Sequence, residues 1–467
     1  MNIAMIGAGY VGLTTAACLA ELGQSIVCAD VDAAKIAQLK RGEIPIHEAG
    51  LDALVARNVA AGRLSFSADP AQASSRAEVV FLAVGTPQGA DGHLNLTHLE
   101  RAARDIATSL RPKSVVVVKS TVPATTNRRL REIIAEKRGN LDFAVASNPE
   151  FLREGTAVRD FMHPDRVVIG TDDSWACATL KQIYAPLERQ GVPVLCTTPT
   201  NAELIKYAAN SFLALKIGFI NDVANLCQAV GADVSTVARG IGLDSRIGEA
   251  FLKPGPGFGG SCFPKDTRGF AAIGREFNAP QPIVEALIEG NARHRQNMAR
   301  KVLKELQRCG GRCVAVLGLS FKAGTADLRE AASLTLLPAL LRAGANVRVS
   351  DPLVGPEILE LFPQVDPYDW PYAAASAADV VVILNEDYGD LDLLRLRRAM
   401  AGNTLIDFRN LYEPQAVAEQ GLRYVSLGRP TADRTQEQPR SVSDRGSANG
   451  VSRAGLIATH QPEEQQI

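Results

Sequence analysis

The chain has 467 residues, which is enough for two or three domains. Hydrophobic residues make up 46% and charged residues 22%, as in ordinary globular proteins, and 50 Lys and Arg against 51 Asp and Glu leave a formal net charge of −1. This charge gives no support for nucleic-acid or membrane-surface binding. The sequence also contains no run of about 18 apolar residues, the length needed to span a bilayer.

An apolar strand opens the chain at Asn2–Ile6 and runs into the glycine-rich turn GAGYVG at 7–12. An amphipathic helix is predicted from about Leu13 to Leu22, and a second strand, Ser25–Ala29, ends in Asp30. The order strand, G-x-G-x-x-G, helix, strand, acid is typical of a dinucleotide-binding βαβ unit.

Each part of this unit has a physical role. Gly7 allows the tight turn, Gly9 lets the backbone approach a pyrophosphate, and Gly12 lets helix and strand pack closely. The helix N-terminus would hold the phosphates. Asp30 can accept from both ribose hydroxyls and would repel a 2′-phosphate, so the sequence predicts NAD rather than NADP.

Apolar runs at Val79–Val84 and Ser114–Val118 resemble buried parallel strands of a doubly wound sheet, which we place in an NAD-binding domain at 1–200. Ligands of such sheets lie outside the carboxyl ends of the strands, so the turns there are candidate site segments. These turns are Gly85-Thr86-Pro87, KSTVP from Lys119, and SNPEFLRE from Ser147, after an expected strand at Phe143–Ala146.

From about Asn201 to Leu226 apolar residues recur at helical spacing with no proline, and a second helical block covers Ile283–Leu306. A long helix between two α/β regions is a natural bridge or dimer surface. We therefore predict a central helical and dimerisation region at 201–308.

The segment GPGFGGSCFPKD at 255–266 places Cys262 between a glycine-rich turn and Asp266. A lone cysteine is usually a small buried hydrophobe, but glycine and proline suit tight turns and close backbone approach rather than a packed core. The adjacent Lys265 would favour the thiolate, which is the nucleophilic form. The segment therefore predicts a reactive cysteine.

Strand and helix then alternate again, with expected strands at Cys313–Leu317, Ala345–Ser350, Asp379–Leu384 and Thr404–Asp407. The expected fold is α/β, with two doubly wound, Rossmann-like parallel-sheet domains joined by a long central helix. The second domain, 309–429, lacks a full G-x-G-x-x-G, so a phosphate-bearing ligand other than the dinucleotide is expected there. The polar residues 430–467 lack periodicity and are predicted to be a disordered tail.

The eight cysteines are scattered, and the N-terminus leads into a strand rather than a signal peptide. Cys309 and Cys313 could suggest a metal pair, but no second Cys or His pair accompanies them, so we predict structural roles and no metal. These features favour a reducing cytoplasm.

Seven motifs in order closely resemble the UDP-glucose/GDP-mannose dehydrogenase family, over roughly residues 1–428. They are GAGYVG at Gly7, GTP at Gly85, KSTVP at Lys119, NPEFLREG at Asn148, NAELIKYAANSFLALKI at Asn201, GPGFGGSCFPKD at Gly255 and GLSFKAGTADLRE at Gly318. Within the family, IGLDSRIG at Ile241 resembles the UDP-glucose branch. In one departure, Asn385-Glu386-Asp387-Tyr388 stands where the family often has Thr-Glu-Trp, which leaves the nucleotide contacts there open.

The resemblance implies a four-electron oxidation, in which C6 of UDP-glucose changes from a primary alcohol to a carboxylate at the expense of two NAD⁺. The first oxidation needs a base for the alcohol proton. The second needs a hydride donor made from the aldehyde, and a thiohemiacetal on Cys262 is such a donor. Its oxidation leaves a thioester, which water must cleave.

The resemblance also implies roles for individual residues. Cys262 resembles the nucleophile, and Lys206 and Asn210, at i and i+4 on one helix face, resemble a pair that holds an oxyanion. Asp266 and Thr121 resemble a pair that handles protons through an ordered water, and Glu150 resembles the base that activates the hydrolytic water.

The implied cofactor contacts are Gly7, Gly9, Tyr10, Val11, Gly12, Asp30, Lys35, Thr86, Thr121, Glu154, Lys265 and Arg329. The implied substrate contacts are Glu150, Phe151, Leu152, Lys206, Asn210, Arg246, Phe251, Phe258, Gly259, Lys322 and Arg409. Among these, Lys322 and Arg409 resemble diphosphate or sugar contacts, and Arg246 resembles an arginine supplied across a dimer interface. Simple surface solvation is the alternative for each basic residue, above all for Arg409.

Three other functions stay open from the sequence. The same chemistry could act on GDP-mannose or a UDP-N-acetyl-hexosamine. A two-electron alcohol dehydrogenase would need no cysteine at the nicotinamide. A non-catalytic module that binds NAD and a nucleotide sugar would be expected to have lost Cys262, Lys206 or Asp266, and all three are present.

Overall fold

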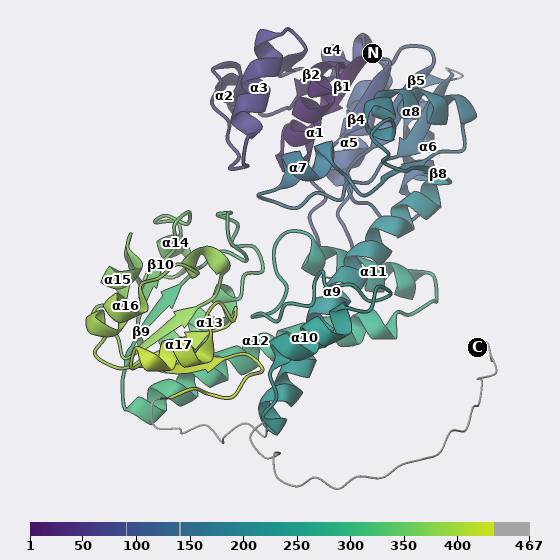
Figure 1. Cartoon of the computed structure of the whole chain (residues 1–467). Helices are drawn as coiled ribbons and strands as arrows, with labels where there is room; N and C mark the ends of the chain where they lie inside the picture. The colour runs from purple at the N-terminus through teal and green to yellow at the C-terminus, as the bar shows by residue number, and fades with distance from the viewer. Residues whose placement is uncertain (90, 140–141, 434–467) are drawn as a thin grey trace, which may run out of the picture.

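The N-terminal part of the chain, purple to blue in Figure 1, is built on a sheet. The sheet has eight strands in the order β3-β2-β1-β4-β5-β6-β7-β8. The structure is a computed structural model that describes residues 1–89, 91–139 and 142–433. The predicted doubly wound arrangement is confirmed, with one addition: β7 pairs antiparallel with β6, so that β7 and β8 run against the first six strands. The strands are β1 Asn2–Ile6, β2 Ser25–Ala29, β3 Leu64–Ser67, β4 Val79–Leu82, β5 Ser114–Val118, β6 Phe143–Ser147, β7 Val167–Gly170 and β8 Val194–Thr197.

Helices cover both faces of this sheet (Figure 1). They are α1 Tyr10–Glu21, α2 Ala33–Lys40, α3 Leu51–Ala60, α4 Pro70–Ser75, α5 Thr97–Ala107, α6 Thr126–Arg138, α7 Ala157–Met162 and α8 Ser174–Glu188. The runs VVFL of β4 and SVVVV of β5 are buried throughout, as expected for central parallel strands with helices on each side.

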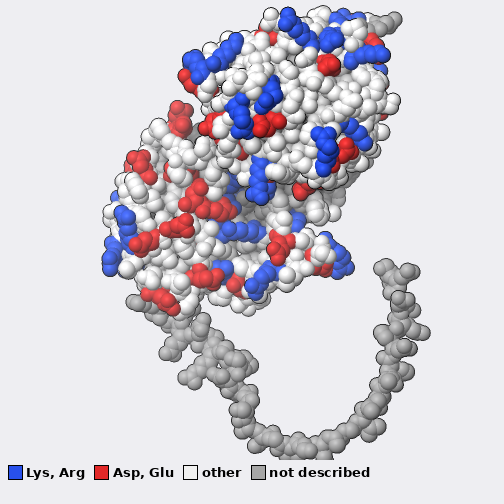
Figure 2. All heavy atoms as spheres, turned by 45° about the horizontal axis from the view of Figure 1, so that its top comes forward, with Lys and Arg blue, Asp and Glu red and all other residues white. Residues whose placement is uncertain are grey.

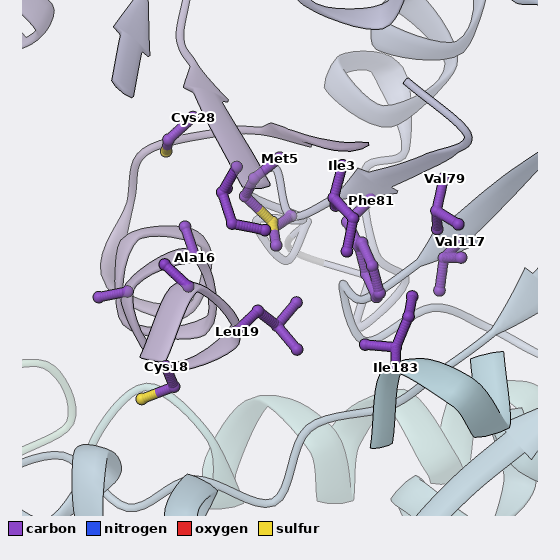
Figure 3. Close-up of a cluster of buried hydrophobic side chains, with 14 of the residues drawn as sticks. Ile3, Met5, Ala16, Cys18, Leu19, Cys28, Val79, Phe81, Val117 and Ile183 are labelled. Carbon is purple, nitrogen blue, oxygen red and sulfur yellow. The ribbon is translucent and has the colours of Figure 1, made fainter. Parts of the chain in front are cut away.

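One core cluster lies between the sheet and helices α1 and α8. Figure 3 shows Met5, Leu19, Phe81 and Ile183 drawn together in this cluster, and all four are fully buried. Because these positions come from strands and helices that are adjacent only in the folded sheet, their burial fixes where the glycine-rich turn before α1 must stand.

A central region of four helices follows, in which α9 is 32 residues long. Its helices are α9 Pro199–Val230, α10 Val234–Gly242, α11 Phe263–Glu276 and α12 Pro282–Cys309. The long helix begins where the Thr198 side chain caps it and Pro199 occupies its first turn. It ends at Gly231, which has the left-handed φ of 77° that suits a helix end.

The second sheet has six parallel strands in the order β11-β10-β9-β12-β13-β14. They are β9 Cys313–Leu317, β10 Asn346–Ser350, β11 Asp366–Pro367, β12 Val380–Ile383, β13 Thr404–Asp407 and β14 Arg423–Ser426. The connecting helices are α13 Ser333–Arg342, α14 Ile358–Leu361, α15 Pro371–Ala374, α16 Leu393–Ala399 and α17 Pro414–Glu419, with a short 3₁₀ turn η1 at Glu386–Tyr388. The second predicted Rossmann-like domain is thereby confirmed.

The predicted tail begins too early at residue 430. Ala432 pairs with Tyr424 of β14 through two backbone hydrogen bonds of 2.8 and 3.1 Å, so residues up to 433 belong to the edge of the second sheet. Paired backbone donors and acceptors override a polar composition there. Residues 434–467 of the predicted tail lie outside the described residues.

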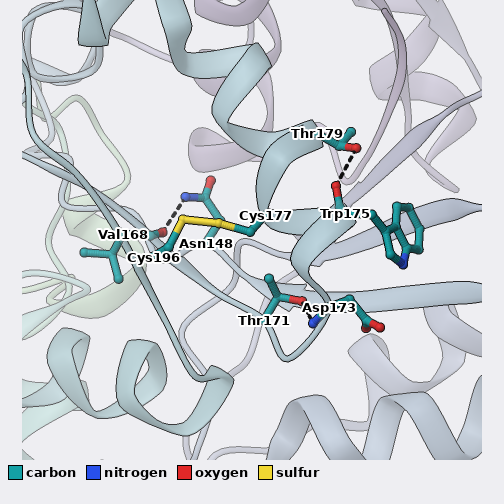
Figure 4. The surroundings of a disulfide bond; sticks show 8 residues. All are labelled: Asn148, Val168, Thr171, Asp173, Trp175, Cys177, Thr179 and Cys196. Atoms are coloured by element: carbon teal, nitrogen blue, oxygen red, sulfur yellow. Dashed lines mark hydrogen bonds between the residues drawn. A yellow bond between two sulfur atoms is a disulfide. The ribbon is translucent and has the colours of Figure 1, made fainter.

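Two of the eight cysteines are bonded to each other. Cys177 of α8 and Cys196 of β8 form a disulfide, shown in Figure 4. After α8 the chain reverses direction and forms β8, the edge strand of the sheet. This reversal brings Cys177 and Cys196, which are 19 positions apart, into contact. Cys309 is exposed and Cys313 half-buried, and both are free.

Charges of both signs are interspersed over the face shown in Figure 2. Within residues 1–89, 91–139 and 142–433, no helix is both long and apolar enough to cross a membrane. The same residues contain no group of three or more His, Cys, Asp and Glu placed to hold a metal ion.

Candidate active site

A cavity of about 750 Å³ opens between the first sheet, the central helices and the second sheet. Its wall includes the turn Asn148–Glu154 after β6, residues 163–167 after α7, the side chains of Lys206 and Asn210 on α9, and the glycine-rich loop that leads into α11. Phe321 and Lys322, from the loop after β9, close it from the other side. The segments that follow β5, β6 and β9 therefore meet at this cavity, whereas the predicted turn Gly85-Thr86-Pro87 after β4 is not among the residues that line it.

Cys262 lies in this cavity wall, at the N-cap position of α11. Glycine is required in the loop just before it because the second sheet approaches so closely. A Cβ on Gly259 would stand 2.3 Å from the carbonyl oxygen of Glu330, and one on Gly260, whose φ is +81°, would stand 2.7 Å from the Phe321 ring. The glycines thus let the loop carry the cysteine between two sheets.

Lys206 and Glu150 form a buried ion pair beside the cysteine. The Lys206 ammonium donates to Glu150 Oε1 at 2.9 Å and to the Glu150 carbonyl at 2.6 Å, with side-chain exposures of 3% and 7%. Burial by itself would raise the pKa of Glu150, but the adjacent ammonium outweighs it and holds the pKa below its usual value. Burial likewise opposes the charge of Lys206, yet Glu150 and Asp266 keep its pKa above the usual value. Both groups are therefore ionised at neutral pH.

Asp266 is completely buried and accepts from two side chains. Asn210 Nδ2 donates to its Oδ2 at 2.6 Å, and Lys265 Nζ donates to its other oxygen. Asn210 is thus hydrogen-bonded to Asp266 rather than to Lys206, although Asn210 and Lys206 both line the cavity. No hydrogen bond joins Asp266 to Thr121 within the described residues; the Thr121 carbonyl accepts from Thr86 Oγ1 at 3.0 Å.

The Cys262 thiol has a raised pKa, contrary to the expectation drawn from its sequence neighbours. Burial raises it most, and the carboxylate of Glu150 raises it further, while Lys206 lowers it in part. Lys265, which the sequence suggested as the activating cation, is instead engaged by Asp266. The resting side chain is therefore a thiol that needs a proton acceptor before it can attack.

The glycine-rich turn at 7–12 and Asp30 lie together at the carboxyl ends of β1 and β2. A Cβ on Gly9 would meet no atom within 4 Å, so open space lies in front of this glycine, whereas a Cβ on Gly12 would stand 1.9 Å from the carbonyl oxygen of Gly7. The Asp30 carboxylate accepts from Ala8 N at 2.8 Å and from Lys35 Nζ at 3.1 Å. Burial acts to raise the pKa of Asp30, but these hydrogen bonds and one from the backbone of Asp32 lower it overall. An ionised acid therefore stands at the end of β2.

Three predicted cofactor and substrate residues meet around Glu154. Its carboxylate accepts from Ser261 Oγ at 2.8 Å and from Arg329 at 3.2 Å, and Lys322 donates to its carbonyl oxygen. Tyr10, at the start of α1, reaches the same turn, because Gly155 N donates to its hydroxyl at 3.0 Å. The two sheets are thus joined at Glu154.

Some predicted substrate residues lie in the cavity and others do not. Phe151, Leu152, Phe251 and Gly259 line it. Phe258 does not, because its ring packs in a core cluster with Ala214 and Leu287. Val11, a predicted cofactor contact in the first turn of α1, is also not among the residues that line it, and neither are the predicted catalytic residues Asp266 and Thr121.

Two arginines also lie outside this wall. Arg409 forms an ion pair with Glu386 at 3.1 Å and donates to the carbonyls of Leu384 and Phe321, so it is not simply solvated. Glu386 belongs to the turn that departs from the family pattern. Arg246 is 87% exposed and pairs with Asp244.

A buried network in the cavity wall was missed from the sequence. Lys119 donates to Asn148 Oδ1 at 3.0 Å, the Tyr184 hydroxyl donates to the same oxygen at 2.5 Å, and Asn148 Nδ2 donates to the carbonyl of Val168. Burial lowers the pKa of Lys119 to about 8. Lys119 and Asn148 each follow a buried strand directly, and that position was the available signal.

Three family models match successive parts of the chain. The NAD-binding domain of the UDP-glucose/GDP-mannose dehydrogenase family matches residues 1–188, its central domain matches 200–293, and its UDP-binding domain matches 315–414.

Full-length relatives show the same similarity. A UDP-glucose 6-dehydrogenase of Rhizobium meliloti is 47% identical over 436 residues, which cover 92% of this chain and all of the relative. One of Pseudomonas aeruginosa is 45% identical and covers 92% and 98%. The solved UDP-glucose dehydrogenase of Pyrobaculum islandicum is 37% identical, with a TM-score of 0.83 over 91% of this chain and 96% of that one.

Proposed function

The chain belongs to the UDP-glucose/GDP-mannose dehydrogenase family, and we infer from this premise that it catalyses the NAD-dependent oxidation of C6 of UDP-glucose to a carboxylate. The observation that carries the inference is one cavity shared by a thiol, Cys262, and a buried ion pair, Lys206 and Glu150. A two-electron alcohol dehydrogenase has no use for the thiol. The names of relatives at 41–47% identity support UDP-glucose over another nucleotide sugar.

We propose that the first oxidation uses Asp266 and Thr121 to take the alcohol proton through an ordered water. Lys206 is placed to hold the oxygen of the reacting carbon, because its ammonium already faces the cavity beside Glu150. Asn210 supports Asp266 in this arrangement through their 2.6 Å hydrogen bond. NAD⁺, when bound, supplies the acceptor for the hydride.

The second half of the reaction is proposed to run on the cysteine. The Cys262 sulfur adds to the aldehyde, and the resulting thiohemiacetal oxyanion stands next to the Lys206 ammonium. Loss of a second hydride leaves a thioester on Cys262, and Glu150 takes a proton from the water that cleaves it. The ion pair keeps the Glu150 carboxylate ionised for this step.

The ratio of NADH to sugar tests this function. We expect two NADH for each UDP-glucose consumed, with no free aldehyde, because the aldehyde is captured by Cys262 before it can leave. The measurement is NADH absorbance against UDP-glucuronate formed, with hydrazine present as an aldehyde trap. GDP-mannose and UDP-N-acetyl-hexosamines serve as comparison substrates. One NADH per sugar with trapped aldehyde would contradict the covalent mechanism.

For the cofactor, we propose that the open space in front of Gly9 takes the pyrophosphate and that Asp30 binds the adenosine ribose. Gly7, Tyr10, Val11 and Gly12 would surround the phosphates. The remaining proposed contacts are Lys35, Thr86, Thr121, Glu154, Lys265 and Arg329.

Replacing Asp30 should change the choice of dinucleotide. The ionised carboxylate repels a 2′-phosphate, so we expect kcat/KM to favour NAD⁺ over NADP⁺ by about 2–4 kcal/mol. Asp30→Asn should remove most of this preference, because a neutral amide no longer repels the 2′-phosphate. Equal kcat/KM values for the two cofactors in the wild-type enzyme would contradict the assignment.

For the nucleotide sugar, we propose that Phe151, Leu152, Phe251 and Gly259 contact it from the cavity wall, and that Lys322 binds the diphosphate. Arg409 and Phe258 support the loop that covers it rather than line the cavity, since Arg409 lies against Gly255 and Phe258 is 95% buried.

We propose that two chains associate along α9. Phe212, Phe219 and Leu226 are each more than half exposed and are spaced seven residues apart, so they form one apolar stripe along the helix. A stripe of this kind on a helix surface favours a second copy of the same chain. Arg246 would then reach the cavity of the partner subunit.

Mixing two inactive variants tests the shared site. Arg246→Ala and Cys262→Ala subunits are each expected to be nearly inactive alone. After exchange, a mixed dimer has one site with an intact cysteine and an intact arginine, so about a quarter of wild-type activity should return. The measurement is NADH formation before and after subunit exchange. A fully active monomer in sedimentation would contradict the proposal.

We also propose that the enzyme works in the cytoplasm, because the reaction needs Cys262 as a free thiol, which a reducing compartment maintains. The Cys177–Cys196 disulfide lies apart from the cavity wall and does not involve this thiol.

A further inference from the structure

The hydrogen bond of the Cys262 sulfur identifies which group can receive its proton. Within the described residues its sulfur has one partner, Ser261 Oγ, at 3.5 Å. The Ser261 hydroxyl in turn donates to Glu154 Oε1 at 2.8 Å. A serine hydroxyl carries a single proton, and because that proton is given to Glu154, Ser261 can only accept at the sulfur. The thiol is therefore the donor, and the three groups form a chain from Cys262 through Ser261 to a carboxylate.

The charged groups around the sulfur are already occupied. Lys206 is an ammonium bound to Glu150, and an ammonium has no lone pair with which to accept a proton. Glu150 accepts from Lys206 and from Leu152 N, and its pKa is held low. Asp266 accepts from Asn210 and from Lys265. None of these groups is hydrogen-bonded to the sulfur.

Glu154 is a better proton acceptor than Glu150. Burial raises its pKa most, and the carboxylate of Asp327 raises it further, while Ser261 and Arg329 lower it in part. Lys322 also faces it, through the Glu154 carbonyl oxygen. A raised pKa increases the proton affinity that a general base needs.

We propose that Ser261 relays the thiol proton of Cys262 to the Glu154 carboxylate as the sulfur adds to the aldehyde, an inference that rests on the proposed function. The S–H bond breaks and its proton passes to Ser261 Oγ, whose own proton passes to Glu154 Oε1. The carbon–sulfur bond forms, and the carbonyl electron pair moves to the aldehyde oxygen. The product is a thiohemiacetal oxyanion beside Lys206, with no oxidant consumed in this step.

The relay spans the two sheets. Asp327 raises the pKa of Glu154 and Arg329 lowers it. Both residues belong to the loop after β9, and Arg329 is 3.2 Å from Glu154. Ser261 and Cys262 precede α11 in the central region. The acceptor is therefore complete only when the second sheet contacts the Asn148–Glu154 turn.

The test supplies the C6 aldehyde of UDP-glucose directly and follows one turnover at saturating NAD⁺. Wild type, Ser261→Ala, Ser261→Thr and Glu154→Gln are compared by NADH absorbance, with Ser75→Ala on α4 as a matched serine control. We expect the alanine and glutamine variants to slow on the order of 10²-fold, because a general base is lost. Ser261→Thr keeps a hydroxyl and should recover most of the rate. In mixtures of H₂O and D₂O, the wild-type single-turnover rate plotted against the fraction of D₂O should be curved, because two protons move in the same step. The curvature should disappear in Ser261→Ala.

A Ser261→Ala enzyme with the wild-type rate and isotope effect would overturn the relay. So would a defect confined to the KM for NAD⁺ with the saturated single-turnover rate intact, since that result means Ser261 only positions a cofactor contact. If Ser261→Ala does not fold, Glu154→Gln decides by the same criteria. Cys262→Ser is run alongside: if it oxidises the aldehyde at the wild-type rate, the covalent mechanism itself fails.

Discussion

A Cys262→Ser enzyme is expected to form no UDP-glucuronate. Serine keeps the size and position of the side chain, but its hydroxyl is a far weaker nucleophile than a cysteine side chain, so the aldehyde is not captured. The first oxidation requires only the alcohol, a base and NAD⁺, and should survive weakly. We therefore expect a trace of NADH, aldehyde that hydrazine can trap, and no acid. Product analysis by chromatography, together with NADH absorbance, measures all three.

Cys309→Ser is the matched control, because Cys309 is an exposed free cysteine outside the cavity wall. It should retain wild-type activity. Normal acid formation by Cys262→Ser, or loss of acid formation in Cys309→Ser, would show that the nucleophile has been assigned wrongly.

The Glu150→Gln enzyme is expected to complete both hydride transfers but not the hydrolysis of the thioester. Both hydride transfers precede hydrolysis, so the variant should release a burst of NADH and then stall as a thioester. Loss of a general base costs roughly 10²–10⁴ in rate, which makes hydrolysis limiting. Glutamine can still accept from Lys206 and Leu152 N through its carbonyl oxygen, so the turn should keep its shape. Intact-mass measurement on quenched enzyme should show a sugar-nucleotide adduct on the peptide that contains Cys262.

The ion pair between Glu150 and Lys206 contributes to stability over a defined range of pH. The pKa of Glu150 lies below 4.5, so its contribution to stability is present above that value and is lost as the pH falls through the lowered pKa. The pKa of Lys206 lies above 10.5, so its contribution is present below that value and is lost as the pH rises further. The pair is thus intact between the two ordinary values.

The rate of thioester hydrolysis in Glu150→Gln should be low at every pH in that range, because the variant has no carboxylate to act as a base. A variant that shows neither burst nor adduct while it still binds NAD⁺ would exclude Glu150 as the hydrolytic base. An adduct on a different cysteine would overturn the assignment of Cys262.

The sequence by itself determined the elements and much of the chemistry. Hydrophobic period, turn residues and helix caps act over a few positions, so β1, β2, β5, β9 and β13 have the predicted bounds. The glycine fingerprint with Asp30 depends on one βαβ unit, which is equally local. The motif around Cys262 likewise lies within twelve consecutive residues.

Only the tertiary structure decided which side chains share an environment. Glu150 and Lys206 are 56 positions apart, and their pairing depends on how α9 crosses the ends of β6 and β7. The same reason explains why the thiol pKa is raised rather than lowered: burial and Glu150 act through space, whereas the sequence offered only Lys265. The contact of Ser261 with Glu154 and the disulfide between Cys177 and Cys196 also join segments that come together through packing. Local propensity fixes the elements, but the energies of charges and buried groups depend on distances that only the packed sheets and helices set.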